Sequence, residues 1–518
     1  MRRLKLWAML LIAASGLSQF TVDAVAKVTR IEVISTSPYG SFKPGEYVRW
    51  DFRVVGEISP TSEQITDVEK PSRNARGMVE YATRVTLIAP AESVRGSGTL
   101  LVDVPNRGRP ISQSVYNSPR HSIIPLGSFD QGTGFLQDNG FSIAAIAWEQ
   151  GYGVELPMFV GDDGKPRYIE GVGLAIVRDV ADFFGTAAAD ASGVRNPIAG
   201  KVSRTIALGY SQTGRFLKSF LVRGFNVTDG RRVFSGMHIL GAASGHIALR
   251  SIPGPNSGAG VTPNFTDPEV RGVNEEPLAI ADIVEQTSKR GEAVPRLMFV
   301  NTTTDYFSIR SSLGRTGASG TQDKPLPENV RMYDMAGASH ALIPGKGDCK
   351  YLYAVLDWHP IMRSTLVALN AWVSAGTPPP ANVLMSLQTA AEGQMALKAP
   401  AHFPQSVTQV PKLDQDGNAT GGVRLPDMAA PLGTHAAQNP PLSFLCSLAA
   451  AYIPFAKTKQ ERESTNDARM SLAERYKDRN EYVNHIRGAA RRLEQQGFLL
   501  PEDAATIVYS AAEANVPK

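Results

Sequence analysis

Thr205-Ile206-Ala207-Leu208-Gly209-Tyr210-Ser211-Gln212-Thr213-Gly214-Arg215 is the stretch that decides the fold of this chain. A short apolar run enters small residues around a serine, and apolar residues recur at helical spacing over 215–223. A serine between a buried strand and a helix is typical of a nucleophile elbow, whose tight turn lifts Oγ clear of the sheet. The spacing is G-x-S-x-x-G, because Thr213 stands where the usual G-x-S-x-G motif has glycine. The alternative is a buried serine in an ordinary strand-to-helix turn.

Strand-like and helix-like segments alternate on both sides of this stretch. Short apolar or mixed runs lie at Thr99–Val104, Ser142–Ala147, Met237–Leu240, Leu297–Val300 and Val330–Met335. Apolar residues recur at helical spacing over Gly171–Phe184 and Ile361–Ala375. Runs that are apolar throughout suit parallel strands that are buried on both faces. The alternation predicts an α/β fold, specifically an α/β-hydrolase fold with a mostly parallel central sheet flanked by helices.

An acid and a histidine follow the serine in the order that this fold uses, which is serine, acid, histidine. Asp305 comes shortly after the run 297–300, and His340 lies in a small-residue loop after the run 330–335. A serine hydroxyl is a poor nucleophile unless a base accepts its proton, and an acid can orient that base. We therefore predict Ser211, Asp305 and His340 as a catalytic triad.

Other acids and histidines remain as alternatives for the triad. Asp323 and Asp334 are the alternative acids, of which the first lies in a loop and the second inside a predicted strand. The alternative bases are His121, His238 and His246. Because these three histidines precede the acid in the chain, they break the expected order.

The remaining site residues are predicted from their places beside the elbow. We expect the backbone N–H groups of Gln212 and Arg107 to form the oxyanion hole; for Arg107 the alternative is a surface turn. Trp148 and Gln150 end a predicted strand and are candidates for the substrate pocket, although an aromatic residue there is more often part of a core. Arg215 either binds a substrate carboxylate or braces the helix, and bracing is the preferred interpretation.

Six segments together resemble one bacterial family, the exported alpha/beta hydrolase domain-containing proteins. They are GYSQTGRFLKSF (209–220), VNTTTDYF (300–307), VRMYDMAGASH (330–340), LVALNAWVSAGTPPP (366–380), VPKLDQDGNATGGVRLPDMAAPLGTH (410–435) and GFLLPEDAATIV (497–508). The resemblance runs from about residue 30 to the C-terminus. It implies a serine hydrolase of carboxylic esters and does not name the substrate. The elbow is also similar to that of glucuronoyl esterases, which share glycine at the third position after the serine.

One segment departs from the family pattern. Thr434-His435-Ala436-Ala437 stands where the resemblance predicts an aromatic-rich stretch. This departure puts a pocket role for that segment in doubt.

The N-terminus has the pattern of an export signal. Arg2, Arg3 and Lys5 precede a short apolar run over 6–14, and Ala24-Val25-Ala26 offers small residues for a signal peptidase. We expect cleavage after Ala26 and a periplasmic or secreted protein. The alternatives are an uncleaved anchor and a buried first helix. The run is too short to span a bilayer, which needs about 20 residues, and no later segment reaches that length.

Composition shifts divide the rest of the chain. We predict an N-terminal β extension over 27–98, a catalytic core over 99–377, a Pro/Gly-rich insertion or cap over 378–458 and C-terminal helices over 459–518. Within the insertion, Asp414-Gln415-Asp416-Gly417-Asn418 is predicted to be a solvated turn. A calcium loop is the weaker interpretation, because the later bidentate glutamate is missing.

Charge and cysteine content limit the partners. The formal charge of +4 on 518 residues gives no reason to expect nucleic acid or anionic lipid. Cys349 and Cys446 are a candidate disulfide in an oxidising compartment, with two buried free thiols as the alternative. The chain has no Walker A, HExxH or dinucleotide motif, so we expect no cofactor and no metal. The expected partner is a small-molecule or polymeric ester, and the oligomeric state stays open.

These observations predict an exported serine hydrolase that cleaves carboxylic esters through an acyl-enzyme intermediate. The alternatives are a lactonase or peptidase, and a catalytically degenerate hydrolase fold that only binds a ligand. Thr213 at the elbow is the feature that favours degeneracy.

Overall fold

The protein is known from a computed structural model, which describes residues 27–62, 64–164, 166–247, 277–354, 356–390, 409–441, 444–514 and 516. The predicted signal segment, residues 1–26, lies outside the described residues. Within the described ranges, every helix falls short of the length and apolarity that crossing a membrane requires.

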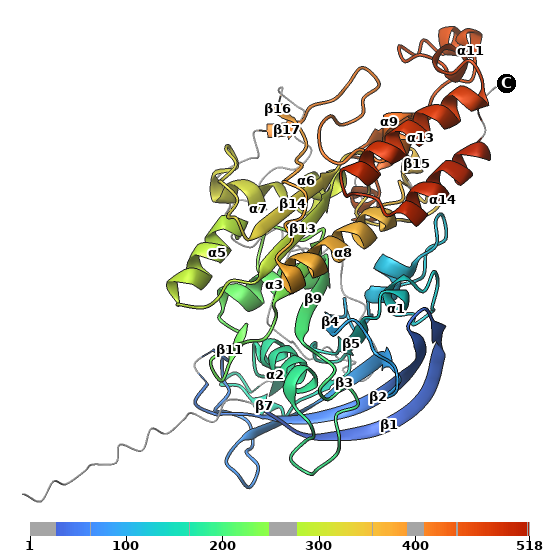
Figure 1. Ribbon diagram of the computed structural model, residues 1–518. Coiled ribbons are helices and arrows are strands. Elements are labelled where there is room, and N and C mark those ends of the chain that lie inside the picture. The colour runs from blue at the N-terminus through green and yellow to red at the C-terminus, as the bar shows by residue number, and fades with distance from the viewer. Residues whose placement is uncertain are drawn as a thin grey trace, which may run out of the picture.

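Ten strands of the described chain form one large sheet (Figure 1). Its order is β1 (Lys27–Phe42), β2 (Gly45–Ile58), β3 (Val79–Pro90), β5 (Ser142–Ile146), β4 (Thr99–Asp103), β9 (Arg204–Tyr210), β12 (Gly236–Leu240), β13 (Arg296–Thr302) and β14 (Val330–Met335), with β6 (Val154–Glu155) beside β3. The strands from β5 to β14 pair in parallel, whereas β1, β2, β3 and β5 pair antiparallel. The predicted mostly parallel central sheet is confirmed.

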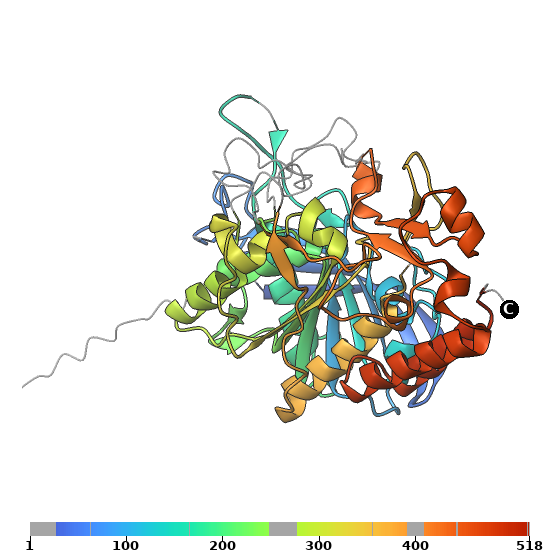
Figure 2. The same ribbon diagram turned by 90° about the horizontal axis from the view of Figure 1, so that it is seen from above.

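Alternate residues of the parallel strands belong to two different cores. In β13, Leu297 and Phe299 lie in one core, while Met298 and Val300 lie in the other. The first core is covered by α2 (Val172–Thr186), α3 (Gln212–Val222) and α5 (Ile280–Lys289); the second is covered by α8 (His359–Ala375). Figure 2 shows α8 on the opposite side of the sheet from α3 and α5. A strand buried on both faces is apolar throughout, which is the pattern that the sequence shows.

The N-terminal strands continue the same sheet. Strands β1 and β2 form a long antiparallel hairpin within the predicted N-terminal β extension. Strand β3 joins this hairpin to β5, with Val85 opposite Ile146. One sheet thus contains strands from both sides of residue 98. The domain boundary proposed at that residue stays a prediction.

The C-terminal part packs against the α8 side of the sheet. It contains a small sheet of β15 (Leu352–Tyr353), β19 (Ala451–Pro454) and β18 (Gly433–Ala436), the pair β16 (Leu387–Thr389) and β17 (Gln409–Pro411), and the helices α13 (Arg479–Gln495) and α14 (Pro501–Ala512). Between these two helices Gly497 has a φ of 82°, and Pro501 begins the second one. Cys349 and Cys446 form a disulfide with their Cα atoms 5.6 Å apart.

Short elements complete the described chain. They are η1 (Gln113–Asn117), α1 (Phe135–Asp138), β7 (Phe159–Val160), β8 (Pro166–Arg167), β10 (Val227–Thr228), β11 (Arg231–Arg232), α6 (Thr303–Ser308), α7 (Ser312–Thr316), η2 (Gly317–Ser319), α9 (Pro426–Ala429), α10 (Phe444–Leu448), α11 (Lys459–Ser464) and α12 (Leu472–Arg475).

The turn at 414–418 is solvated only in part: Gln415 is exposed as predicted, whereas Asp416 and Asn418 are buried. Asp414 Oδ1 accepts hydrogen bonds of 3.0 Å from the N–H groups of Asp416 and Asn418. Asp416 forms an ion pair with Arg475, and Asn418 accepts a hydrogen bond of 2.7 Å from the His435 N–H. Both carboxylates therefore accept hydrogen bonds from the protein itself. The contact with β18 joins distant segments, and local sequence does not reveal it.

Candidate active site

The turn from β9 to α3 has the geometry of an elbow. Ser211 follows the strand with φ 58° and ψ −110°, a backbone conformation that costs free energy in a residue with a Cβ. A Cβ on Gly209 would lie 2.7 Å from the carbonyl oxygen of Thr213, so strand and helix meet too closely there for any side chain. The site therefore depends on a strained serine that the surrounding packing holds in place.

Thr213 has a local structural role that explains the departure from the usual motif. Its Oγ1 accepts a hydrogen bond of 3.0 Å from the Tyr210 N–H and donates one of 3.2 Å to the Tyr210 carbonyl oxygen. The threonine closes the turn around Ser211. The close contact with the next strand falls instead on Gly214, where a Cβ would lie 2.8 Å from the Cβ of Ala242.

Ser211, His340 and Asp305 lie in one hydrogen-bonded row. His340 Nε2 is 2.9 Å from Ser211 Oγ, and His340 Nδ1 is 2.5 Å from Asp305 Oδ1. Asp305 is fully buried and His340 nearly so, whereas Ser211 is partly exposed. The structure thus brings the three predicted residues together, and their catalytic roles stay a prediction.

Asp305 is fixed by a capping box at the start of α6. Thr302 ends β13, and its Oγ1 accepts a hydrogen bond of 3.1 Å from the Asp305 N–H. Asp305 Oδ2 accepts one of 2.7 Å from the Thr302 N–H in return. This exchange leaves Oδ1 to face the imidazole. The pattern T-x-x-D after a buried strand was a signal for this geometry that the sequence analysis did not use.

Two residues that the sequence analysis missed position the His340 ring. The Tyr210 hydroxyl donates a hydrogen bond of 2.5 Å to the His340 carbonyl oxygen, and the two rings stack with centroids 5.1 Å apart. Gly241 lies under the acid and the base at a φ of 54°. A Cβ there would lie 2.9 Å from both Asp305 Oδ2 and His340 Nδ1, so the pair needs glycine at this position.

The alternative acids and bases have other partners. His238 Nδ1 lies 2.7 Å from the Tyr116 hydroxyl, and burial lowers the pKa of His238 to about 3. Burial, with the charges of nearby cations, lowers the pKa of His246 to about 4. Asp323 and Asp334 both form ion pairs with Arg315. His121 is exposed in the loop after η1.

The two predicted oxyanion donors differ in their surroundings. Gln212 is the first residue of α3, and among the described residues its N–H donates no hydrogen bond. The Arg107 N–H instead donates a hydrogen bond of 3.0 Å to Gln212 Oε1. In this state the side chain of Gln212 occupies the second donor, so the oxyanion role of Arg107 stays a prediction.

Glu149 is a further polar residue beside the elbow that the sequence analysis missed. Its Oε1 accepts a hydrogen bond of 3.2 Å from Gln212 Nε2, and its Oε2 has no hydrogen-bond partner among the described residues. Burial raises the pKa of Glu149, and the charge of Arg107 opposes this rise. A glutamate directly after the buried strand β5 was a signal that could have found it.

The three pocket candidates have separate roles. Trp148 is buried, donates a hydrogen bond of 2.8 Å to the Pro105 carbonyl oxygen and packs on Phe216, with ring centroids 4.6 Å apart. Arg215 is buried and donates one of 3.0 Å to the His246 carbonyl oxygen, which ties α3 to the next loop. The side-chain oxygen of Gln150 is buried without a partner among the described residues. Their contact with a substrate stays a prediction.

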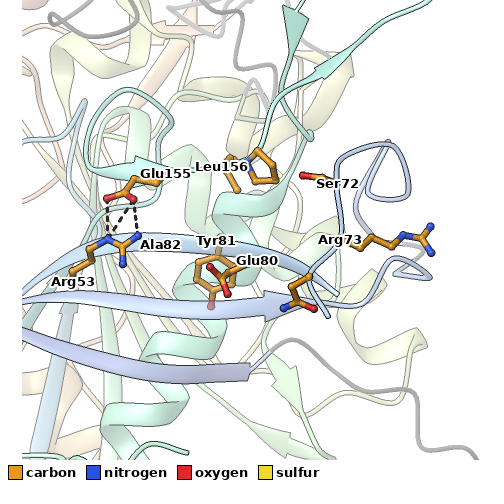
Figure 3. Close-up of a pocket in the computed structure, with 10 residues that line it drawn as sticks. Arg53, Ser72, Arg73, Glu80, Tyr81, Ala82, Glu155 and Leu156 are labelled. Atoms are coloured by element: carbon orange, nitrogen blue, oxygen red, sulfur yellow. Dashed lines mark hydrogen bonds and ion pairs between the residues drawn. The ribbon is translucent and has the colours of Figure 1, made fainter. Parts of the chain in front are cut away.

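A separate hollow of about 370 Å³ lies over β2, β3 and β6 (Figure 3). Arg53 and Glu155 on its wall pair with each other at 2.7 Å, so their charges are already compensated. This hollow contains none of the predicted site residues.

One group of metal-ligating side chains lies together among the described residues, namely Asp348, Cys349 and Cys446. Both sulfurs are joined in the disulfide. They are therefore not thiolates that bind a metal ion.

A sequence model of a family described as an alpha/beta hydrolase domain matches residues 30–509. A comparison with curated proteins finds no match.

Three solved structures are similar to this chain. One is an S-formylglutathione hydrolase from Staphylococcus aureus, with 9% identity, 59% of this chain and 91% of that chain covered, and a TM-score of 0.26. A glucuronoyl esterase from Teredinibacter turnerae has 12% identity, coverages of 56% and 69%, and a TM-score of 0.27. The rice cell wall degrading esterase LipA from Xanthomonas oryzae has 8% identity, coverages of 60% and 90%, and a TM-score of 0.29.

Proposed function

Because the chain belongs to the alpha/beta hydrolase domain family, as its resemblance predicted, we propose that it is a serine hydrolase that cleaves carboxylic esters. One observation carries this proposal. The imidazole of His340 bridges the hydroxyl of Ser211, on a strained turn, and the buried carboxylate of Asp305. A strained nucleophile, a base in hydrogen-bond contact and an acid behind the base are the parts that acyl transfer needs.

In the proposed first step, Ser211 Oγ attacks the ester carbonyl while its proton passes to His340 Nε2. Asp305 holds the ring with Nδ1 protonated and stabilises the imidazolium that forms. The Gln212 N–H donates to the developing oxyanion at the start of α3. The carbon–oxygen bond of the ester then breaks, and His340 returns the proton to the leaving alcohol.

The second half of the proposed reaction reverses these roles. A water molecule gives its proton to His340 Nε2 and attacks the acyl-enzyme carbonyl. The bond to Ser211 Oγ then breaks, and the serine recovers its proton as the carboxylic acid leaves.

We also propose that the protein is exported and that residues 1–26 are removed. Two observations support this proposal: the charged, then apolar, then small-residue order of the N-terminus, and the disulfide between Cys349 and Cys446. We also keep the division into an N-terminal extension, a catalytic core, an insertion and C-terminal helices as a proposal.

Active-site labelling tests the proposed function. A fluorophosphonate probe should label the wild-type protein and should not label Ser211→Ala. Ser374→Ala is the matched control because Ser374 is exposed on α8, and it should label like the wild type. Absence of labelling in folded wild-type protein would reject the hydrolase and favour a protein that only binds a ligand.

A substrate panel then separates the classes of hydrolase. We expect hydrolysis of p-nitrophenyl esters and none of peptide anilides. Faster turnover of lactones than of linear esters would replace the esterase with a lactonase, and cleavage of anilides alone would replace it with a peptidase.

A further inference from the structure

A second cavity lies on the α8 side of the sheet and is separate from Ser211. It has a volume of about 220 Å³ and lies between the small sheet β15-β19-β18, the start of α8 and helix α13. Figure 1 shows β15, α9 and α13 gathered at this corner of the molecule. The lining residues used below are Tyr353, Asp357, Asp427, His435, Tyr452 and Tyr482.

Three polar atoms in this cavity lack hydrogen bonds. Tyr353 Oη, Asp357 Oδ2 and His435 Nδ1 have no partner within the part of the chain that the structure describes. Their residues are only 5%, 4% and 8% exposed. A buried polar group without a partner is unfavourable and rare in folded proteins. Three of them around one cavity therefore indicate that something else supplies the missing partners.

The polar groups are held rigidly in place. Asp357 Oδ1 accepts hydrogen bonds from the N–H and the Nδ1 of His359, at 3.1 and 2.6 Å, which leaves Oδ2 toward the cavity. The backbone N–H of His435 donates a hydrogen bond to Asn418 Oδ1, and the His435 ring packs on Tyr452 with centroids 5.2 Å apart. A ligand would find these groups already oriented, and binding would lose little conformational entropy.

Two of the charged groups around the cavity compensate each other, and the remaining carboxylate belongs to Asp357. Asp427 is paired with Arg120, whose Nη2 is 3.1 Å from both carboxylate oxygens. Burial by itself raises the pKa of Asp357, but the hydrogen bonds from His359 and the charge of Arg120 outweigh it and lower the pKa to about 2. Burial lowers the pKa of His435 to about 4, so this ring is neutral at pH 7. An anionic ligand would be repelled by Asp357, whereas the unpartnered Asp357 Oδ2 can accept a hydrogen bond from a neutral hydroxyl group.

We propose that this cavity binds a neutral polyhydroxylated molecule about as large as one sugar ring. A hydroxyl group both donates and accepts, so neighbouring hydroxyls of one ligand can donate to Asp357 Oδ2 and accept from the Tyr353 hydroxyl. The rings of Tyr452 and Tyr482 offer apolar faces for the C–H groups between those hydroxyls. The cavity volume corresponds to roughly seven waters at ~30 Å³ each, which is enough for one such ring.

A metal ion fits the cavity less well. Its acidic and histidine lining residues form no cluster of three close ligand atoms among the described residues; they are Asp357, Asp427, His121 and His435. The inference goes beyond the proposed ester hydrolysis, because none of the residues that it uses belongs to the row of Ser211, His340 and Asp305.

Calorimetric titration of the full-length protein tests this proposal. The neutral probes are D-glucose, D-xylose and myo-inositol, and the charged probes are D-glucosamine and D-glucuronate. We expect at least one neutral probe to bind with a Kd of about 1 mM or tighter. We expect the matched charged sugars to bind more weakly. Ser211→Ala should bind the neutral probe as the wild type does, which keeps this test separate from the proposed hydrolase activity.

Substitutions in the cavity show where the probe binds. Tyr353→Phe removes only the hydroxyl and should weaken binding roughly tenfold, and Asp357→Asn should weaken it at least as much. Tyr509→Phe is the control, because Tyr509 is 75% exposed on α14, and it should leave the Kd unchanged. Thermal unfolding curves of each variant confirm that it is folded; Tyr353→Phe keeps the test valid if Asp357→Asn does not fold.

Three results would overturn the proposal. One is the absence of binding heat for every neutral probe, which would leave water as the only occupant. Another is tighter binding of glucosamine or glucuronate than of the neutral sugars. The last is wild-type affinity in both Tyr353→Phe and Asp357→Asn.

Discussion

The protein contains two buried aspartate–histidine pairs, and they differ in what faces the imidazole. In both, a carboxylate oxygen lies close to Nδ1, at 2.5 Å for Asp305–His340 and 2.6 Å for Asp357–His359. His340 Nε2 faces Ser211 Oγ. The ring of His359 hydrogen-bonds only to Asp357 among the described residues, and it packs on Trp358 with centroids 4.6 Å apart. An acid–base pair alone does not make a catalytic site; the nucleophile at the second nitrogen does.

The backbone around the two pairs differs as well. His340 lies in a loop after β14, over the left-handed Gly241 and next to the strained Ser211. His359 begins α8 with a proline after it, and Asp357 accepts its backbone N–H as well as its ring. The first pair is assembled from two separate strand ends, whereas the second is a local cap at one helix start. We therefore expect the first pair to control activity and the second to control stability.

The largest effect should come from the nucleophile that only the first pair has. Ser211→Ala should lower kcat for a p-nitrophenyl ester by about 10⁶-fold, because the groups of a triad act as a unit. Single-turnover and steady-state assays measure this loss. Unfolding in urea should show no destabilisation, because alanine keeps the Cβ of the serine and leaves the packing around the turn unchanged. A variant that kept more than a tenth of the wild-type rate would contradict the assignment of Ser211 as the nucleophile.

The same substitution in each acid should separate the two pairs. Asp305→Asn should lower kcat by roughly 10⁴-fold, because the amide favours the wrong imidazole tautomer. Asp357→Asn should change kcat by less than about threefold, since it lies outside the row that contains Ser211. Equal losses of kcat in the two variants would contradict the assignment of catalysis to the first pair.

The glycine under the first pair should have an intermediate effect. Gly241→Ala places a methyl group 2.9 Å from both Asp305 Oδ2 and His340 Nδ1, so it must displace them. We expect kcat/KM to fall about 10²-fold, the usual result of a displacement of about 1 Å in a catalytic group.

Gly376→Ala is the matched control for this substitution. Gly376 also has a positive φ, 72° at the end of α8, but a Cβ there meets nothing within 4 Å. It should cost stability through its backbone conformation and leave kcat/KM of the folded enzyme unchanged. A loss of activity in Gly376→Ala as large as in Gly241→Ala would show that backbone strain alone explains the result.

The smallest expected effect is on the stability of the protein at low pH, through the second pair. The pKa of Asp357 is lowered from its ordinary value of 3.8 to about 2 in the folded protein. A lowered folded-state pKa means that its contribution is complete above pH 4 and is lost as the pH falls through about 2. The free energy of unfolding of the wild type should exceed that of Asp357→Asn by about 2 kcal/mol less at pH 2 than at pH 6.

Urea unfolding of both proteins at several pH values measures this change. A difference that stays constant with pH would mean that the Asp357 carboxylate is not stabilised by its hydrogen bonds. A difference that grew on acidification would reverse the sign of the argument.

Several features of the site follow from short stretches of sequence. The apolar run before Ser211 and the helical spacing after it indicated the elbow, because a strand and a helix each depend mainly on neighbouring residues. The order of Ser211, Asp305 and His340 along the chain singled out the residues that the structure brings into contact. The contacts of Gly241, Tyr210 and Glu149 were not predicted, since each involves a segment far away in the chain.

Two interpretations show where local pattern reaches its limit. The turn at 414–418 has the composition of a solvated loop, yet Asp416 and Asn418 within it are buried against Arg475 and β18. Arg107 was predicted to offer its N–H to an oxyanion, yet in the structure that N–H donates to Gln212 Oε1. In both cases the partner lies about 20 residues or more away, and composition carries no record of it.

By itself, the sequence determined the alternating strands and helices, the strained serine turn and the even pair of cysteines, because periodicity and turn sterics act between near neighbours. The chain order favoured Asp305 and His340, but only the tertiary structure decided that they contact each other and Ser211, and that Tyr353, Asp357 and His435 surround one cavity. These outcomes depend on how loops from separate strand ends pack together, and side-chain contacts between such loops are set by the whole core.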